Sequence, residues 1–225
     1  MIFIYYGENS FLIQEKLTAI RAKYEAKFSS GLNFWKLDLE EDPDNLKSIV
    51  DSQSMFEEKK LAFLRGIFSI AEAKWDEVKK TIQNIGESND VILVFYDFLI
   101  PKESAKKRLE FLSKSGKSEE FRNFERPKFI NWILEKSKSA GLNMERTEAG
   151  YLTDNIGLDP HRASAEILKL ASYKNGGVLS KKDIDAVVPF DTYSNSFKAI
   201  DALLNKNAVL ALKGLEEQWI KNEVK

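Results

Sequence analysis

Short apolar runs alternate with helix-like segments through the first 124 residues, and this alternation limits the possible folds more than any other feature of the chain. The strongest run covers residues 91–96, and residues 2–6 form a similar run that is closed by Gly7. Strands buried on both faces of a parallel sheet have this continuous apolar pattern. Three weaker candidate strands lie at residues 34–39, 61–64 and 120–124.

Between these runs, apolar residues recur at three- and four-residue steps, which predicts amphipathic helices that each pack one face. The first helix follows Asn9, a residue type that caps helices, and carries Ile13 and Leu17 on its apolar face. The Asp-Pro-Asp sequence at residues 42–44 predicts a second helix start, and residues 70–85 a third helix. Strands joined by helices need crossover connections, so we expect a mostly parallel sheet covered on both sides.

The pattern changes near residue 125, beyond which only helical signals are present. Gly157 ends one predicted helix, and Asp159 with Pro160 opens another. Ser180 and Asp183 have the spacing of a capping box for a short helix. The sequence therefore predicts an α/β domain at residues 1–124, a small helical domain at 125–189, and the incomplete beginning of a further helical domain at 190–225.

The composition removes most enzyme classes. The chain has no cysteine and one histidine, which excludes thiolate nucleophiles and cysteine-ligated zinc and makes a histidine-based triad hard to assemble. That histidine, His161, lies in the polar start of a predicted helix, where we expect a solvated side chain. We therefore expect no catalytic residue, no metal and no cofactor. No apolar run approaches the ~20 residues of a membrane span, and the N-terminus has no signal-peptide pattern, so the expected location is cytoplasmic.

The turn after the first strand is where a nucleotide-binding loop would lie, but its glycines are missing. A phosphate loop needs G-x-x-x-x-G-K-[ST], whereas residues 7–17 are GENSFLIQEKL. Lys16 falls inside the predicted helix and precedes Leu17, so the phosphate cradle and the magnesium-binding hydroxyl are both absent. Asp97 ends the strongest strand but precedes Phe98, which leaves no acid pair to act on a magnesium-bound nucleotide.

Two segments depart from the overall balance of 34 basic and 35 acidic residues. Residues 38–58 hold eight acids and one lysine, whereas residues 98–138 hold eleven basic residues and six acids. The basic segment is a candidate for contact with phosphates, although its six glutamates favour a solvated helical face. The net charge of −1 does not indicate a protein held on nucleic acid by bulk charge.

Met55 and Phe56 form an unusual pair of large apolar side chains inside the polar segment SQSMFEEKK at residues 52–60. Methionine is flexible and polarizable and phenylalanine is a rigid anchor, so an adjacent pair on a polar loop suits insertion into a partner's pocket. The alternative is that both side chains fold back under the preceding helix and cap the sheet. Composition does not separate these two interpretations.

Taken in their order, these features resemble the delta subunit family of the bacterial DNA polymerase III clamp loader. The opening IYYGENSFLIQEK at residues 4–16 is similar to that family's strand, small turn and helix beginning Phe-Leu. The resemblance spans nearly the whole chain. Its further motifs are MFEEKKL at 55–61, the strand at 91–97, KKRL at 106–109, WI at 132–133, AGL at 140–142, residues 149–157, EILKLASY at 166–173, LSKKDI at 179–184 and FKAIDALL at 197–204.

The resemblance implies an AAA+ type domain without a functional phosphate loop, followed by a helical lid domain and the start of a helical collar domain. It implies a non-catalytic subunit that binds and opens the sliding clamp, with Met55 and Phe56 as the hydrophobic wedge. The implied partners are the clamp, the other subunits of a hetero-pentameric loader, and primed DNA through the assembled complex. Since the resemblance covers only about two helices of the collar, the chain is either a fragment or a short member of the family.

Two other functions remain open at the level of sequence. One is a degenerate nucleotide-binding protein in which Asp97 and Lys16 retain a weak ATPase activity. The other is a DNA-binding accessory protein that uses the basic segment after Phe98. A sister subunit of the same loader carries a cysteine-ligated zinc module, and the absence of cysteine argues against that assignment.

Overall fold

The computed structural model describes residues 1–28, 31–53, 59–85, 90–189, 208 and 212. The chain divides into two compact units, Met1–Asn123 and Phe124–Lys225. The predicted collar segment, residues 190–225, lies outside the described residues apart from Ala208 and Leu212, which are both helical. No helix among the described residues has the length and apolar character needed to cross a membrane.

The first unit contains a five-stranded sheet in which all pairings are parallel, in the order β2-β3-β4-β1-β5. This confirms the predicted parallel sheet. The central strand β4 pairs with β1 and β3, and Ile4 lies opposite Phe95 in the register. The strands are β1 (Ile2–Tyr6), β2 (Phe34–Asp38), β3 (Lys60–Arg65), β4 (Val91–Asp97) and β5 (Lys117–Glu120).

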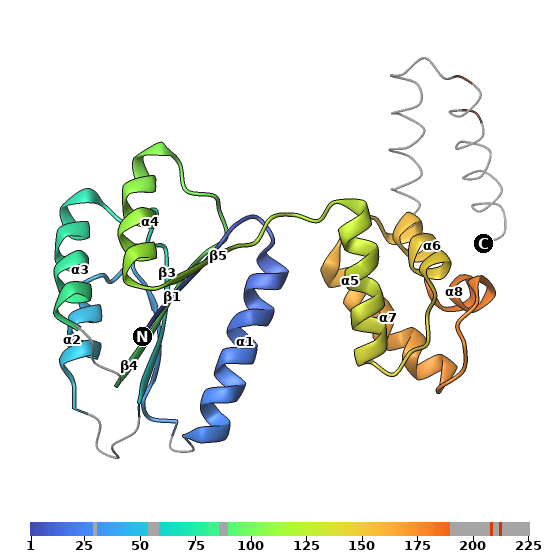
Figure 1. Cartoon of the computed structure of the whole chain (residues 1–225), viewed down its shortest axis with the longest axis horizontal. Helices are drawn as coiled ribbons and strands as arrows, with labels where there is room; N and C mark the ends of the chain where they lie inside the picture. Colours follow the sequence, from blue (N-terminus) through green and yellow to red (C-terminus); the bar gives the residue numbers. More distant parts are fainter. Residues whose placement is uncertain (29–30, 54–58, 86–89, 190–207, 209–211, 213–225) are drawn as a thin grey trace. The chain divides into compact units, whose positions relative to one another are not determined.

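Helices cover the two faces of this sheet unequally. Among the described residues of the first unit, one face packs against three helices and the other face against α1 alone (Figure 1). The helices of this unit are α1 (Ser10–Lys27), α2 (Asn45–Asp51), α3 (Glu72–Ile85) and α4 (Glu103–Ser115).

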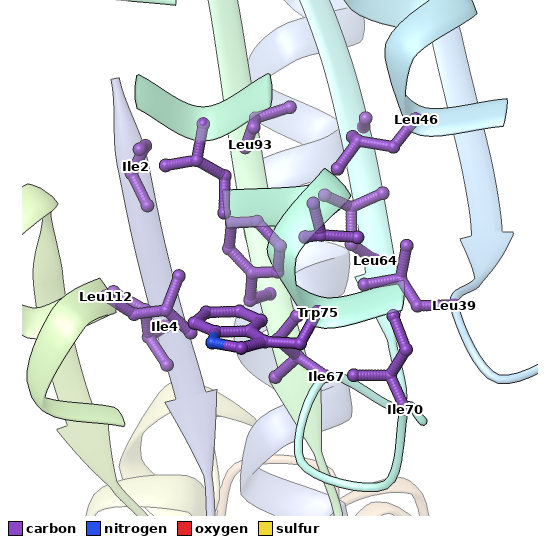
Figure 2. Packing of buried hydrophobic residues seen from close by; sticks show 14 of the residues in the cluster. Ile2, Ile4, Leu39, Leu46, Leu64, Ile67, Ile70, Trp75, Leu93 and Leu112 are labelled. Atoms are coloured by element: carbon purple, nitrogen blue, oxygen red, sulfur yellow. The ribbon is translucent and has the colours of Figure 1, made fainter. Parts of the chain in front are cut away.

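The larger core lies between the sheet and α2, α3 and α4. Trp75 of α3 is 7% exposed and lies among aliphatic side chains of the strands and helices, as Figure 2 shows. Its ring meets Phe111 of α4 edge to face, with the ring centroids 5.7 Å apart. The fully buried members of this core are Ile4, Leu39, Ala62, Leu64, Ile67, Leu93, Phe95 and Leu112.

The smaller core lies under α1. Ile13 and Leu17 of α1 are buried there, together with Val94 of the central strand, as the helical spacing predicts. Several apolar residues on this face are only partly buried, among them Phe3, Ile20, Phe28, Phe34, Ile92, Phe98 and Phe121. Within the described part of the first unit, one helix therefore leaves part of this face of the sheet uncovered.

Two element boundaries in the first unit differ from the predicted ones. The fifth strand is Lys117–Glu120 and not residues 120–124. The prediction missed it because this edge strand is polar and is held by backbone pairing with β1. The predicted helix start at residues 42–44 is close to the observed one, since the Asp42 carboxylate accepts a hydrogen bond from the Asn45 N–H at 3.3 Å, but α2 itself begins at Asn45, after Pro43. Helix α4 lies in the stretch of basic residues for which the sequence favoured a solvated helical face.

The second unit is a bundle of short helices in its described part. Phe129 and Ile133 of α5, Leu152 of α6 and Leu170 of α7 are fully buried or nearly so. The helices are α5 (Arg126–Ser139), α6 (Arg146–Ile156), α7 (Pro160–Lys174) and α8 (Lys181–Val187).

Helix ends in this unit follow the local sequence. Asp159 caps α7 by accepting hydrogen bonds from the backbone N–H groups of His161 and Arg162. The predicted capping box of α8 is confirmed, since the Ser180 N–H donates to the Asp183 carboxylate at 2.8 Å. Hydrogen bonds from Lys174 and Ser180 lower the pKa of Asp183 to about 2.

Candidate functional site

The proposed wedge residues Met55 and Phe56 lie outside the described residues, in the segment 54–58. The structure describes both ends of this segment. The N-terminal end follows the last turn of α2 at Ser52, and the C-terminal end leads through Lys59 into β3. The site can therefore be built from its two flanks.

Lys60 joins the two flanks. It is the first residue of β3 and is 6% exposed, although it is a lysine. Its ammonium group donates hydrogen bonds to the backbone carbonyls of Ile49 at 3.1 Å, Val50 at 2.6 Å and Ser52. These carbonyls belong to the C-terminal end of α2, where the helix leaves acceptors without partners and its dipole favours a cation. Burial lowers the pKa of Lys60.

Tyr24 holds the other flank. Its phenol lies within hydrogen-bond distance of the carbonyls of Lys59 at 2.6 Å and Asn33 at 3.1 Å. Tyr24 belongs to α1, which packs on the opposite face of the sheet from α2. Its side chain therefore connects α1 to Lys59, the residue before β3. Neither Lys60 nor Tyr24 was predicted as a site residue from the sequence. A charged residue at the start of an apolar strand, KLAFL, was the available signal for Lys60.

The turn between β1 and α1, where a phosphate loop would lie, is bonded to the chain after β5. The Asn9 N–H donates to the Phe121 carbonyl at 3.0 Å, and the Phe121 N–H donates to the Tyr6 carbonyl at 2.7 Å. Gly7 has φ +134°, and a Cβ atom placed on it would lie 2.1 Å from the Phe121 carbonyl oxygen. Glu8 adds a carboxylate to the same turn.

Lys16 and Asp97 are engaged elsewhere and do not form a common site. The Lys16 ammonium, in the second turn of α1, pairs with Glu119 of β5 at 2.9 Å, and this hydrogen bond raises the pKa of Lys16. The Asp97 carboxylate is 4% exposed and accepts a hydrogen bond from the Phe68 N–H at 3.1 Å. Burial raises the pKa of Asp97 to about 6, and the charge of Glu40 adds to this shift.

The basic segment after Phe98 is not one surface. Arg108 of α4 is 6% exposed and donates to the carbonyls of Ile67 and Ile70, so it is a buried structural residue. Other cations of this segment pair with nearby glutamates, as Lys106 does with Glu103 at 2.5 Å. The segment also crosses from the first unit into the second.

Among the residues that the structure describes, no three histidine, aspartate or glutamate side chains form a cluster that could hold a metal ion. His161 lies in the first turn of α7 and its side chain is exposed. The candidate site is therefore the segment with Met55 and Phe56 together with its two flanks.

The fold is similar to those of two solved bacterial proteins. The chain is 18% identical to the Bacillus subtilis DNA clamp loader delta protein, with a TM-score of 0.71 over 98% of this chain and 68% of that one. It is 12% identical to the Thermotoga maritima RuvB Holliday junction branch migration motor, with a TM-score of 0.50 over 82% of this chain and 60% of that one. The first unit is thus an α/β domain of the AAA+ type, and it is followed by a helical domain.

The family follows from the sequence match. The model of the family described as DNA polymerase III, delta subunit, matches residues 3–121, more than half of the chain. The chain belongs to this family. It is 24% identical over 226 aligned residues to the probable DNA polymerase III subunit delta of Aquifex aeolicus, which covers 96% of this chain. The chain spans 63% of that relative's length.

Proposed function

We propose that this chain binds the sliding clamp of DNA polymerase III and opens one of its interfaces, so that an ATP-driven loader can place the clamp on primed DNA. The observation that carries this proposal is the family match over residues 3–121, which includes the segment with Met55 and Phe56. The match makes insertion into a partner's pocket the favoured interpretation of that pair.

Met55 and Phe56 are the proposed contacts with the clamp. Burying a large apolar side chain contributes about 1.5–3 kcal/mol, so the pair supplies roughly two to four powers of ten in affinity. The bonds of Lys60 to the end of α2 and of Tyr24 to Lys59 support this role, because they fix both flanks from which the segment is presented.

We propose that the chain hydrolyses no ATP itself. Phosphate binding at the start of a helix needs backbone N–H groups that are free to meet the anion. In the β1–α1 turn, Asn9 uses its N–H on the Phe121 carbonyl, and the Gly7 position lies directly against that carbonyl. The Lys16 ammonium is paired with Glu119, which supports the same proposal.

The proposed partners are the sliding clamp and the other subunits of a hetero-pentameric clamp loader, with primed DNA reached through the assembled complex. We propose that clamp binding belongs to the domain at residues 1–124, with a lid domain at 125–189 and collar residues at 190–225. A replication subunit of this family acts on the bacterial chromosome, so the proposed location is the cytoplasm.

Calorimetric titration with the sliding clamp from the same source tests this proposal. The parent chain should bind, and the double variant Met55→Ser with Phe56→Ser should lose about two to four powers of ten in affinity while keeping its circular dichroism spectrum and unfolding midpoint. The matched control is Leu99→Ser with Ile100→Ser, an adjacent apolar pair that is 37% and 44% exposed in the same unit. This control should bind as the parent does.

Two results would contradict the proposal. If the wedge variant binds as tightly as the parent, Met55 and Phe56 are not the contacts. If the folded parent does not bind at all, the proposed clamp-binding function of the chain is wrong.

A further inference from the structure

The uneven cover of the sheet leaves apolar surface beside α1. Five strands spaced about 4.8 Å apart make a sheet roughly 20–25 Å wide, whereas one helix with its side chains is about 10 Å wide. On the other face, α2, α3 and α4 share this width (Figure 1). A single helix cannot cover the α1 face, so open grooves remain along it.

One of these grooves lies between α1 and strands β1, β4 and β5, and its volume is about 800 Å³. Its floor is apolar. Phe3, Ile20, Phe28 and Ile92 are half-buried there, and Tyr5, Tyr24 and Leu61 are buried beneath them. Partly buried aliphatic and aromatic side chains in a concave surface favour contact with apolar groups of a partner.

The rim of this groove, which we call the lysine groove, is positively charged. Lys16, Lys23 and Lys27 stand seven and four residues apart and therefore lie along one side of α1. Lys59, Lys117 and the N-terminal ammonium of Met1 also line the groove. The pKa of that ammonium is lowered by burial and, further, by the charge of Lys59.

Carboxylates compensate little of this charge. Among the residues that line the groove, Glu119 is the single acid, and it pairs with Lys16. In the described part of the chain, Lys23, Lys27, Lys59 and Lys117 form no ion pair with a carboxylate. A partner that brings carboxylates to this rim would gain favourable contacts along its length.

The second groove along α1 differs in charge. It has a volume of about 920 Å³ and contains both signs of charge, with the ion pair of Arg21 and Glu25 at 2.7 Å and that of Arg65 and Asp38 at 3.7 Å. Its charges are therefore largely balanced within the chain. Of these two grooves, the lysine groove is the one whose positive charge is not balanced by nearby carboxylates.

We propose that the lysine groove docks an amphipathic helix of a partner protein, with an apolar stripe on the floor and acidic residues along both edges of the stripe. The lysines of α1 span eleven residues, about 16 Å, which matches roughly three turns of a partner helix. This surface and partner lie beyond the clamp contact proposed for Met55 and Phe56.

The floor favours a peptide over single-stranded nucleic acid. Bases stack on open ring faces. Here the Tyr5 ring stacks with Phe3 and lies under the Lys16 ammonium, with the nitrogen 5.6 Å from the ring centroid. The Phe28 ring meets Tyr24 and lies under the Lys27 ammonium at 5.6 Å. Ring faces are thus engaged within the chain, and the aliphatic Ile20 and Ile92 suit leucine-like side chains.

Fluorescence anisotropy with a labelled peptide tests the proposal on the full chain. The probe is a helix-forming peptide of roughly 15 residues, about four turns, in which leucines at three- and four-residue steps are flanked on both sides by glutamates. It should bind at low salt and weaken as salt rises, because exposed charge pairs are screened. The same peptide with lysines in place of the glutamates should not bind.

Variants locate the binding. Lys23→Glu with Lys27→Glu should weaken the glutamate peptide by about tenfold or more. The matched control, Lys80→Glu with Lys107→Glu, reverses two exposed lysines of α3 and α4 and should leave binding unchanged. Ile20→Ser should also weaken binding while keeping the salt dependence, since it alters the floor and not the rim.

Several outcomes would overturn the proposal. They are no binding of the glutamate peptide, equal binding of the lysine peptide, and equal loss in the two pairs of charge reversals. A fourth outcome combines two results. Single-stranded oligothymidylate displaces the peptide from the parent chain, and the double variant Lys23→Glu with Lys27→Glu no longer binds that DNA. That result would assign the groove to nucleic acid.

Discussion

The ammonium nitrogen of Lys60 lies 2.6 Å from the backbone carbonyl oxygen of Val50 and so ties the first residue of β3 to the last turn of α2. Because Lys60 also donates to the carbonyls of Ile49 and Ser52, all three of its N–H donors are used. A buried lysine with this geometry acts as a C-terminal cap of α2 that is supplied by the next strand in the sequence.

Lys60→Met should lower the free energy of unfolding by about 2–3 kcal/mol, because methionine fills the same space but leaves the α2 carbonyls without their donor. Urea unfolding followed by circular dichroism measures this. Lys47→Met is the control, since Lys47 is an exposed residue of the same helix and should change stability by less than about 0.5 kcal/mol. Equal effects of the two variants would refute the capping role of Lys60.

Asp97 should make stability depend on pH. Its pKa is about 6 in the folded chain, against about 3.9 for an unfolded aspartate. Between these values the folded state binds more protons than the unfolded state, so the free energy of unfolding should fall as pH rises from about 4 to about 6 and stay lower above it.

Asp97→Asn should remove this dependence. The variant should be more stable than the parent by about 1–3 kcal/mol at pH 7.5, and the two should converge near pH 4. The asparagine oxygen can still accept the Phe68 N–H. Urea unfolding at both pH values checks this, with the exposed Asp76→Asn as control. A variant that is less stable than the parent at pH 7.5 would show that the Asp97 charge is favourable in the fold.

Gly7→Ala should destabilise the first unit by about 2–4 kcal/mol, because its Cβ would lie 2.1 Å from the Phe121 carbonyl oxygen at a φ of +134°. Gly31→Ala separates the two causes. Gly31 also has a positive φ, +67°, but no atom of the described residues lies within 4 Å of the Cβ position, so only backbone strain of about 1 kcal/mol should appear. Equal losses of stability would mean that the contact with Phe121 can relax at little cost.

Nucleotides should not stabilise the chain. A ligand that binds only the folded state raises the unfolding temperature in proportion to the logarithm of its concentration over Kd. Since the β1–α1 turn is bonded to Phe121, millimolar MgATP should leave the midpoint of thermal unfolding unchanged. A saturable rise that disappears in Lys16→Met would instead support the degenerate nucleotide-binding alternative.

Continuous apolar runs were enough to predict β1, β3 and β4, because strands inside a parallel sheet are buried on both faces, whereas the edge strand β2 was predicted from the alternation of its residues. The family match of residues 3–121 also agrees with the resemblance seen in the order of motifs. The polar strand β5 was placed wrongly, since an edge strand is held by backbone hydrogen bonds to β1 that leave no mark on its side chains.

The sequence by itself determined the fold class, the missing phosphate loop and the position of the Met55–Phe56 pair, since all three depend on residue type and local spacing. Only the tertiary structure decided the strand order, the contact of Phe121 with the β1–α1 turn and the bonds of Lys60. It also decided that, within the described first unit, one face of the sheet packs against a single helix that leaves part of that face uncovered. The strand order and the Phe121 contact join segments far apart in the chain, and the Lys60 bonds depend on how α2 packs beside the strand that follows it, so no local residue pattern encodes them.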